Sequence, residues 1–343
     1  MYKRQKLWYN IVRYNKATKE AERMKKAIRN TAIAAGLGTL GISAVMYRCG
    51  ISRKLYLLPK LMAVMQKDGD AQRQYKAVMP AYEAGKAWFE AQRTVEKHLF
   101  SFDGLKLYAH FLRCGESKCT VILCHGYRGS GLGDFGGIVR YLYEELGLNI
   151  LLITERSHGK SEGSHMTYGI KERYDICGWA RLIASEYPDH SIFLYGISMG
   201  AASVLMTPTT ELPGNVKGLI GDCGYTSPDD IFRVVARSWF HLPAFPFVNI
   251  AEVYARIFGH FNFAECSAKE ALSQTKLPVL LFHGTADDFV PAYMSDENYA
   301  ACSGEKKLVK INGAYHATSY YIDFEKYTEA LSGFIEKHRE KQK

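Results

Sequence analysis

The chain has 343 residues, 47% of them hydrophobic, so it can bury a large core and is not of the disordered class. The formal net charge is +9, and residues 1–30 carry ten Lys and Arg against two Glu. This basic N-terminal tail holds nearly all of the excess positive charge, so the chain after residue 30 is close to neutral. Nucleic acid is therefore not an expected partner.

An uncharged apolar segment follows the tail. Residues 31–47 lie between Arg29 and Arg48, and their number is at the short end of what a membrane span needs. A buried amphipathic helix and a signal-peptide core are the alternatives, because glycines make the segment only modestly apolar. We expect a single N-terminal transmembrane helix, with the basic tail in the cytoplasm and the rest of the chain facing outward. A cytoplasmic protein is the other interpretation.

The pattern of apolar residues changes from helical to extended near residue 98. Residues 48–97 have helix-like spacing, which predicts a helical linker region. From residue 98, two runs with a period of two flank Asp103-Gly104, a strong turn signal for a β-hairpin. Apolar strands and helices then alternate, which predicts a mostly parallel sheet with helices on both faces. The expected strands are 120–124, 149–154, 191–195 and 216–222, and the expected helices lie near 134–146, near 171–186 and from Met199.

The eight cysteines show no repeated metal-binding spacing, so no metal site is expected. Several lie in apolar runs typical of small buried side chains. Only Cys114 and Cys119 flank a short turn where a disulfide could cross-link a hairpin. The sequence leaves their pairing, and with it the redox compartment, open. No glycine-rich phosphate loop or dinucleotide fingerprint occurs, so no cofactor is expected.

The clearest chemical motif is Gly196-Ile197-Ser198-Met199-Gly200, which follows an apolar run and precedes small residues. It predicts a strand, a sharp turn and a helix, with the Ser198 hydroxyl projecting above the sheet. Such a turn strains the serine backbone and is tolerable only if the flanking positions lack bulk. The pattern is typical of a nucleophilic serine.

Two further residues complete a candidate catalytic set. Asp287 follows the apolar run 280–282 and His316 follows the run 308–311, so each is expected in a loop just beyond a strand. A serine needs a base to take its proton and an acid to orient that base, and the order Ser198, Asp287, His316 suits those roles. The structural alternatives are a helix cap for Asp287 and an ordinary loop histidine for His316.

Two backbone N–H groups are expected to form an oxyanion hole. Met199 follows the nucleophile and offers the first, and Tyr127 offers the second from the loop after the strand that ends at Cys124. In that loop, the turn His125-Gly126 lets the backbone approach a substrate closely. His125 itself is expected to be a hydrogen-bonded scaffold residue.

Over residues 98–337 the chain resembles the α/β-hydrolase superfamily, in its serine-aminopeptidase-like and Bem46-like bacterial branch. The resemblance rests on the elbow serine, the terminal histidine, the H-G-x-x-D-x-x-V-P pattern at 283–291 and the R-x-H-G-x-S pattern at 156–161. It implies an α/β-hydrolase fold. It also favours Asp287 over the neighbouring Asp288 as the acid, because only Asp287 fits the first pattern. The second pattern implies a structural role for Arg156, His158 and Ser161.

An insertion at about 225–275 is rich in large aromatic residues, and Pro243 and Pro246 divide it into two helical pieces. By resemblance it is a small helical cap over the nucleophile, and its aromatic side chains favour an acyl or aromatic small-molecule substrate. Plain packing of these side chains on the sheet is the alternative.

The sequence therefore predicts a serine hydrolase that cleaves a carboxylic ester or an acyl thioester through an acyl-enzyme. A serine peptidase and a non-catalytic binding module on the same fold are the alternatives. We also expect that removal of residues 1–50 releases the protein from membranes and leaves hydrolysis intact.

Overall fold

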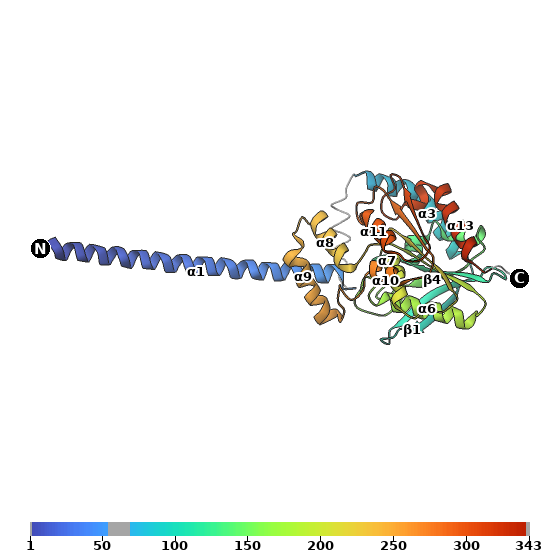
Figure 1. Cartoon of the computed structure of the whole chain (residues 1–343), viewed down its shortest axis with the longest axis horizontal. Coiled ribbons are helices and arrows are strands. Elements are labelled where there is room, and N and C mark those ends of the chain that lie inside the picture. The colour runs from blue at the N-terminus through green and yellow to red at the C-terminus, as the bar shows by residue number, and fades with distance from the viewer. Residues whose placement is uncertain (1, 54–68, 341–343) are drawn as a thin grey trace.

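A computed structural model describes residues 2–53 and 69–340, with only the backbone described for 2–21 (Figure 1). Its core is an eight-stranded sheet in the order β1-β2-β4-β3-β5-β6-β7-β8. The first two strands are antiparallel to their neighbours, and the remaining pairs are parallel. This arrangement confirms the predicted fold class. The strands are β1 (Val95–Phe100), β2 (Lys106–Leu112), β3 (Cys119–Cys124), β4 (Asn149–Thr154), β5 (Ser191–Ile197), β6 (Val216–Asp222), β7 (Val279–Gly284) and β8 (Lys306–Ile311).

Helices cover both faces of the sheet, and each face has its own apolar core. In β3, Ile122 and Cys124 belong to one core, whereas Val121 and Leu123 belong to the other, as the two-residue period of a strand requires. The first core holds α6 (Glu172–Glu186), α7 (Met199–Met206), the short 3-10 helix Thr207–Thr209, α10 (Ala268–Gln274) and α11 (Tyr293–Ala301). The second holds α3 (Asp70–Glu90), α4 (Gly131–Phe135), α5 (Val139–Glu144), α12 (Ser319–Ile322) and α13 (Phe324–His338).

The helix expected near 134–146 is instead two short helices, α4 and α5. They are separated at Gly136 and Gly137, where another chain segment packs closely. A Cβ on Gly137 would lie 2.2 Å from the Tyr321 hydroxyl oxygen, so a larger residue there would require the Tyr321 side chain to move. β1 begins at Val95, three residues before the expected change of pattern at 98, and the other predicted strands and helices of the sheet region lie within two residues of their expected ends.

The N-terminal region forms one continuous helix, α1 (Tyr2–Gly50), which projects from the body as a long rod (Figure 1). The basic tail and the apolar segment are therefore parts of a single element about 73 Å long. Its segment Glu22–Gly50 is long and apolar enough to cross a membrane. Only 17% of an apolar 18-residue stretch within this segment is buried. That exposure does not fit a buried core helix. An anchor and a signal sequence both match the segment's length and composition.

The end of α1 is fixed to the body of the molecule by its last carbonyl groups. The Cys49 carbonyl accepts hydrogen bonds from the Tyr127 hydroxyl and the Arg128 guanidinium, both at 3.0 Å. The Gly50 carbonyl accepts one from the Tyr168 hydroxyl at 2.7 Å. The last carbonyl groups of a helix lack hydrogen-bond donors within the helix. The three donors named here supply these hydrogen bonds and fix the orientation of α1 relative to the body.

Within the region 48–97, the described residues form the end of α1, the helix α3 and the start of β1 at Val95. The apolar run around Leu55 to Met65 lies outside the described residues. Tyr47 is buried in the first core, so removal of residues 1–50 would take away part of that core. The deletion is therefore expected to weaken the fold on which hydrolysis would depend.

The cap consists of α8 (Pro228–Ser238), α9 (Ala244–Tyr254) and a single π-helical turn, Ala255–Gly259. The two prolines act at the start of α9: Pro243 precedes its first residue, and the backbone is non-helical at Phe245, next to Pro246. The Tyr254 hydroxyl donates to the Leu40 carbonyl at 3.3 Å, so α9 packs against α1. Cys114 and Cys119 are both free thiols, so the candidate disulfide between them is not formed.

Candidate active site

Ser198 lies in a strained turn between β5 and α7. Its φ of 57° and ψ of −119° are unusual for a residue with a side chain. A Cβ on Gly196 would lie 2.2 Å from the Gly200 backbone, and one on Gly200 would lie 1.9 Å from the Cys124 carbonyl oxygen. Both glycines are thus required by the close approach of β3, β5 and α7. This is the physical basis of the G-x-S-x-G pattern.

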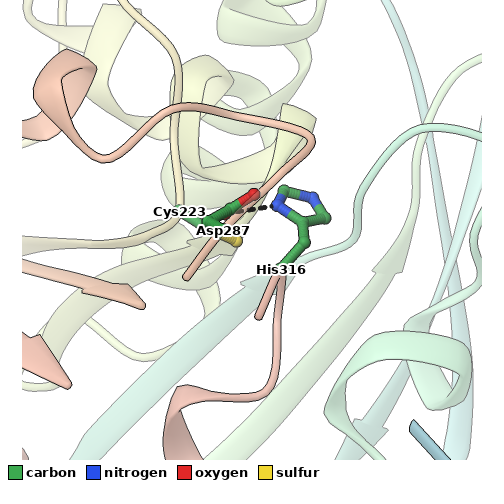
Figure 2. A group of neighbouring side chains, drawn as sticks. All are labelled: Cys223, Asp287 and His316. Carbon is green, nitrogen blue, oxygen red and sulfur yellow. Dashed lines mark hydrogen bonds and ion pairs between the residues drawn. The ribbon is translucent and has the colours of Figure 1, made fainter. Parts of the chain in front are cut away.

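The structure brings Ser198, His316 and Asp287 together from three separate loops. His316 Nε2 lies 2.9 Å from Ser198 Oγ, and His316 Nδ1 lies 2.7 Å from Asp287 Oδ2. Figure 2 shows the imidazole facing the carboxylate. The arrangement requires that Nδ1–H donates to Asp287, which leaves Nε2 free to accept the hydroxyl proton. These contacts form an unbroken chain from the carboxylate to the serine oxygen.

Asp287 is held by its own loop. Its second oxygen, Oδ1, accepts hydrogen bonds from the backbone N–H groups of Phe289 and Val290 at 3.0 and 2.8 Å. The neighbouring Asp288 is exposed and makes no hydrogen bond to the imidazole within the part of the chain that the structure describes. Of the two adjacent carboxylates, it is Asp287 that contacts His316.

The charges of this pair stabilise each other. Burial alone would lower the pKa of the His316 imidazole, but the Asp287 carboxylate outweighs it and raises this pKa well above its usual value. Burial would likewise raise the pKa of the Asp287 carboxyl. The His316 and His283 rings outweigh it and hold this pKa below the usual range. Near neutral pH, Asp287 is therefore ionised whether His316 is neutral or protonated.

A third side chain, Cys223, lies beside this pair (Figure 2). Ligand atoms of Cys223, Asp287 and His316 lie within 4.8 Å of one another, the spacing of a small metal site. Burial raises the pKa of the Cys223 thiol to about 11, so it is not a thiolate at neutral pH. The facing atoms of the other two residues already bond to each other. The chemistry of this donor set fits a hydrogen-bonded dyad better than a metal site.

The two expected oxyanion donors lie next to Ser198. Met199 is the first residue of α7, so its N–H has no intrahelical acceptor. Tyr127 follows Gly126, where an added Cβ would lie 3.1 Å from Ser198 Cβ. The Gly126 N–H donates to Asp134 Oδ2 at 2.5 Å, which fixes the turn before Tyr127. Burial raises the pKa of the Asp134 carboxyl to about 6.

His125 and the loop 156–161 act as scaffold in the structure. His125 Nδ1 donates to the Gly126 carbonyl at 2.9 Å and Nε2 accepts from the Glu155 N–H at 3.1 Å. The buried Arg156 guanidinium forms an ion pair with the buried Asp175 at 2.6 Å and another with the more exposed Asp103 at 3.0 Å. The other two loop residues bond backbone groups: His158 Nε2 accepts from the Arg128 N–H, and Ser161 Oγ donates to the Thr154 carbonyl.

A cavity of about 510 Å³ lies above Ser198, and none of the described residues that line it is charged. Its walls come from three parts of the molecule. From α1 come Gly38, Gly41, Ile42, Val45, Met46, Cys49 and Gly50, and from the cap come Ile231, Phe232, Val235, Phe240 and Leu242. The body contributes Tyr127, Tyr168, Ser198, Met199, Tyr225 and Phe289.

Sequence reasoning missed two groups of residues at this site. The first is the α1 face of the cavity. The second is on α3, where the Gln74 side chain accepts from the Tyr315 N–H at 2.8 Å and donates to the Gly313 carbonyl at 2.9 Å. The Tyr75 hydroxyl donates to the His316 carbonyl at 2.8 Å. These contacts join residues more than two hundred positions apart, so no local pattern signals them.

Comparison with known proteins gives consistent similarities. Residues 115–261 match the family model described as serine aminopeptidase, S33, a range that includes Ser198 and ends before Asp287 and His316. The uncharacterized Bacillus subtilis protein YqkD is 25% identical over 252 residues, 72% of this chain and 82% of that protein. Human monoglyceride lipase is 27% identical over 258 residues, 64% of this chain and 82% of the lipase. The Pyrococcus furiosus esterase Pf2001 superposes with a TM-score of 0.58 at 22% identity, covering 73% of this chain and 94% of the esterase.

Proposed function

The chain belongs to the α/β-hydrolase superfamily, and from that premise we propose that it is a serine hydrolase of carboxylic esters or acyl thioesters. The observation that carries the proposal is the chain of contacts from Asp287 through His316 to Ser198 Oγ, at 2.7 and 2.9 Å. Both distances are within the range needed for proton transfer in a nucleophile, base and acid set.

In the proposed reaction, Ser198 Oγ attacks the substrate carbonyl carbon while His316 Nε2 takes the hydroxyl proton. The backbone N–H groups of Met199 and Tyr127 stabilise the oxyanion that forms. The bond to the leaving alcohol or thiol then breaks, and His316 returns the proton to that group. Water repeats the sequence on the acyl-enzyme, which releases a carboxylic acid and restores Ser198.

The cavity supports an ester rather than a peptide substrate. A peptidase that trims chain ends needs a charged group to hold a peptide terminus, and the described lining of this cavity has none. The similarity to a monoglyceride lipase and to an esterase favours the same choice. A serine peptidase is the second candidate, because the family model that matches residues 115–261 is described as a serine aminopeptidase.

Rates on matched substrates test this proposal. We expect the purified protein to hydrolyse p-nitrophenyl esters with a higher kcat/KM than aminoacyl p-nitroanilides. In Ser198→Ala, ester turnover should fall by about 10⁴-fold or more, since the nucleophile is lost. Circular dichroism of both proteins shows whether the variant is folded. A preference for the anilides would favour the peptidase, and full ester turnover in Ser198→Ala would remove Ser198 from the mechanism.

We also propose that α1 anchors the protein in a membrane. The support is its long exposed apolar stretch and the positive charge at its N-terminal end, which favours a cytoplasmic N-terminus.

A further inference from the structure

The last three turns of α1 form one wall of the Ser198 cavity. The lining residues Gly38, Gly41, Ile42, Val45 and Cys49 recur at intervals of three and four, so they share one helix face. A Cβ built on either glycine would meet nothing within 4 Å. At Gly38 and Gly41, this face of the helix therefore borders open space rather than a packed contact.

The wall leads away from the nucleophile. Its Cys49 end lies at Tyr127, which follows the Gly126 turn beside Ser198. Its Gly38 end is about 16 Å further along the helix axis. A hydrocarbon chain laid along this face from Ser198 would extend roughly a dozen methylenes, at about 1.25 Å each for a 1.52 Å C–C bond.

If α1 spans the membrane, the Gly38 end of this wall lies within the hydrocarbon core of the bilayer. The uncharged stretch between Arg29 and Arg48 is about 27 Å long as a helix, close to the roughly 30 Å of a hydrocarbon core. Gly38, Gly41 and Val45 lie within that stretch. Ile42 and Val45 line the cavity and are also exposed, at 41% and 55%. The cavity thus continues onto the surface that α1 would present to lipid.

The cap carries a matching apolar surface. Phe245 is 75% exposed and Phe258 is 56% exposed, and Val253 and Ile257 are exposed between them in sequence. The rings of Phe258 and Tyr47 are 6.0 Å apart, so Phe258 lies beside α1. Figure 1 shows α9 next to the part of α1 that enters the body. Exposed apolar side chains around the base of a span are suited to contact with lipid.

We propose that the substrate is a membrane-resident lipid ester whose acyl chain lies along the Gly38 and Gly41 face of α1 and enters from the bilayer. This inference rests on the proposed ester hydrolysis. The helix is then part of the acyl-binding site as well as an anchor. Tyr225, whose buried hydroxyl has no hydrogen-bond partner among the described atoms, is one of the residues that line the same cavity.

The chemistry of this step is ordinary ester hydrolysis. A bond forms between Ser198 Oγ and the acyl carbon, the ester C–O bond breaks, and the alcohol leaves with the proton from His316. Water then releases the fatty acid. The chain on α1 only positions the carbonyl, so the inference concerns which acyl groups are cleaved.

A pair of glycine variants tests the binding face. Gly41→Leu adds a side chain inside the cavity, whereas Gly36→Leu adds the same side chain to α1 where the residue is exposed and lines no part of the cavity. Full-length proteins are placed in phosphatidylcholine vesicles, and rates are expressed per active site titrated with a fluorophosphonate. We expect Gly41→Leu to lower the ratio of kcat/KM for a dodecanoyl ester over a butanoyl ester by about 10-fold or more. The ratio in Gly36→Leu should stay within about twofold of wild type. Equal ratios in the two variants would overturn the inference.

A cross-linking probe tests the path of the chain. An alkyl fluorophosphonate that ends in a diazirine first labels Ser198 in the vesicles, and light then couples its free end to the nearest residue. We expect the cross-link on α1 between residues 33 and 42. A cross-link found only on α8 or on the sheet would overturn the proposed path while ester hydrolysis stood. Absence of both labelling and ester turnover in the wild type would overturn the proposed function, and this inference with it.

Discussion

In the proposed mechanism, Ser198, His316 and Asp287 each depend on a neighbour for reactivity. The serine hydroxyl is a weak nucleophile until His316 Nε2 accepts its proton at 2.9 Å. The imidazole in turn is oriented and its protonated form stabilised by Asp287. The carboxylate is fixed by two backbone N–H groups of its own loop. A substitution of either His316 or Asp287 should therefore lower the reactivity of the Ser198 hydroxyl.

The pH dependence of hydrolysis follows from the His316 pKa. Only the neutral imidazole can accept a proton, and Asp287 raises its pKa above the usual 6.5 or so. We expect kcat/KM to fall as the pH drops, with a midpoint above about 6.5. In Asp287→Asn the carboxylate is lost but burial remains, so the midpoint should move to lower pH and the plateau rate should fall by about 10⁴-fold.

The adjacent carboxylate provides a matched control for this profile. Asp288→Asn removes an exposed negative charge one residue away, so both the midpoint and the plateau should stay close to wild type. A profile that moves in Asp288→Asn and not in Asp287→Asn would reverse our assignment of the acid.

At the residue scale, the sequence predicted the residues of the candidate site but not the residues that hold them in place. Ser198, Asp287 and His316 could be located because each follows a strand, and a strand end is a local pattern. Asp134, which fixes the Gly126 turn, could not be located, because its role depends on a contact made only in the fold.

At the element scale, α3 braces the loop that carries His316. Gln74 bonds the Tyr315 N–H and the Gly313 carbonyl, and it also accepts from the Thr318 hydroxyl at 2.6 Å. The region before 98 showed only helix-like spacing in the sequence, so its partner could not be predicted. In the proposed mechanism, α3 therefore positions the loop that carries the base.

Loss of this brace should slow catalysis more than it weakens binding. In Gln74→Ala three hydrogen bonds to the loop disappear, and we expect kcat to fall by about 10- to 100-fold with little change in KM. Gln92→Ala is the control, because the Gln92 side chain donates to the Trp88 carbonyl at 2.9 Å, away from the His316 loop. Steady-state kinetics on a soluble ester distinguish the two. An unchanged kcat in Gln74→Ala would mean that the loop holds His316 without α3.

On the scale of the whole molecule, the fold joins α1 and the sheet, which the sequence patterns predicted as separate parts. The pattern of charge and apolarity predicted a span in α1, and the alternation of strands and helices predicted the sheet. Neither pattern could predict that α1 ends inside the body of the molecule, where the Tyr47 hydroxyl bonds His165 Nε2 at 2.8 Å. Such contacts link residues over a hundred positions apart. The consequence is a cavity whose walls come from the helix, the cap and the sheet together.

The central claim, that Ser198 is an activated nucleophile, is tested most directly by covalent labelling. The full-length protein and Ser198→Ala are treated with a fluorophosphonate at neutral pH, and their intact masses are measured. We predict a single adduct on the wild type and none on the variant. A folded wild type that remains unlabelled, or an adduct that persists in Ser198→Ala, would contradict the account and favour a binding module on the hydrolase fold.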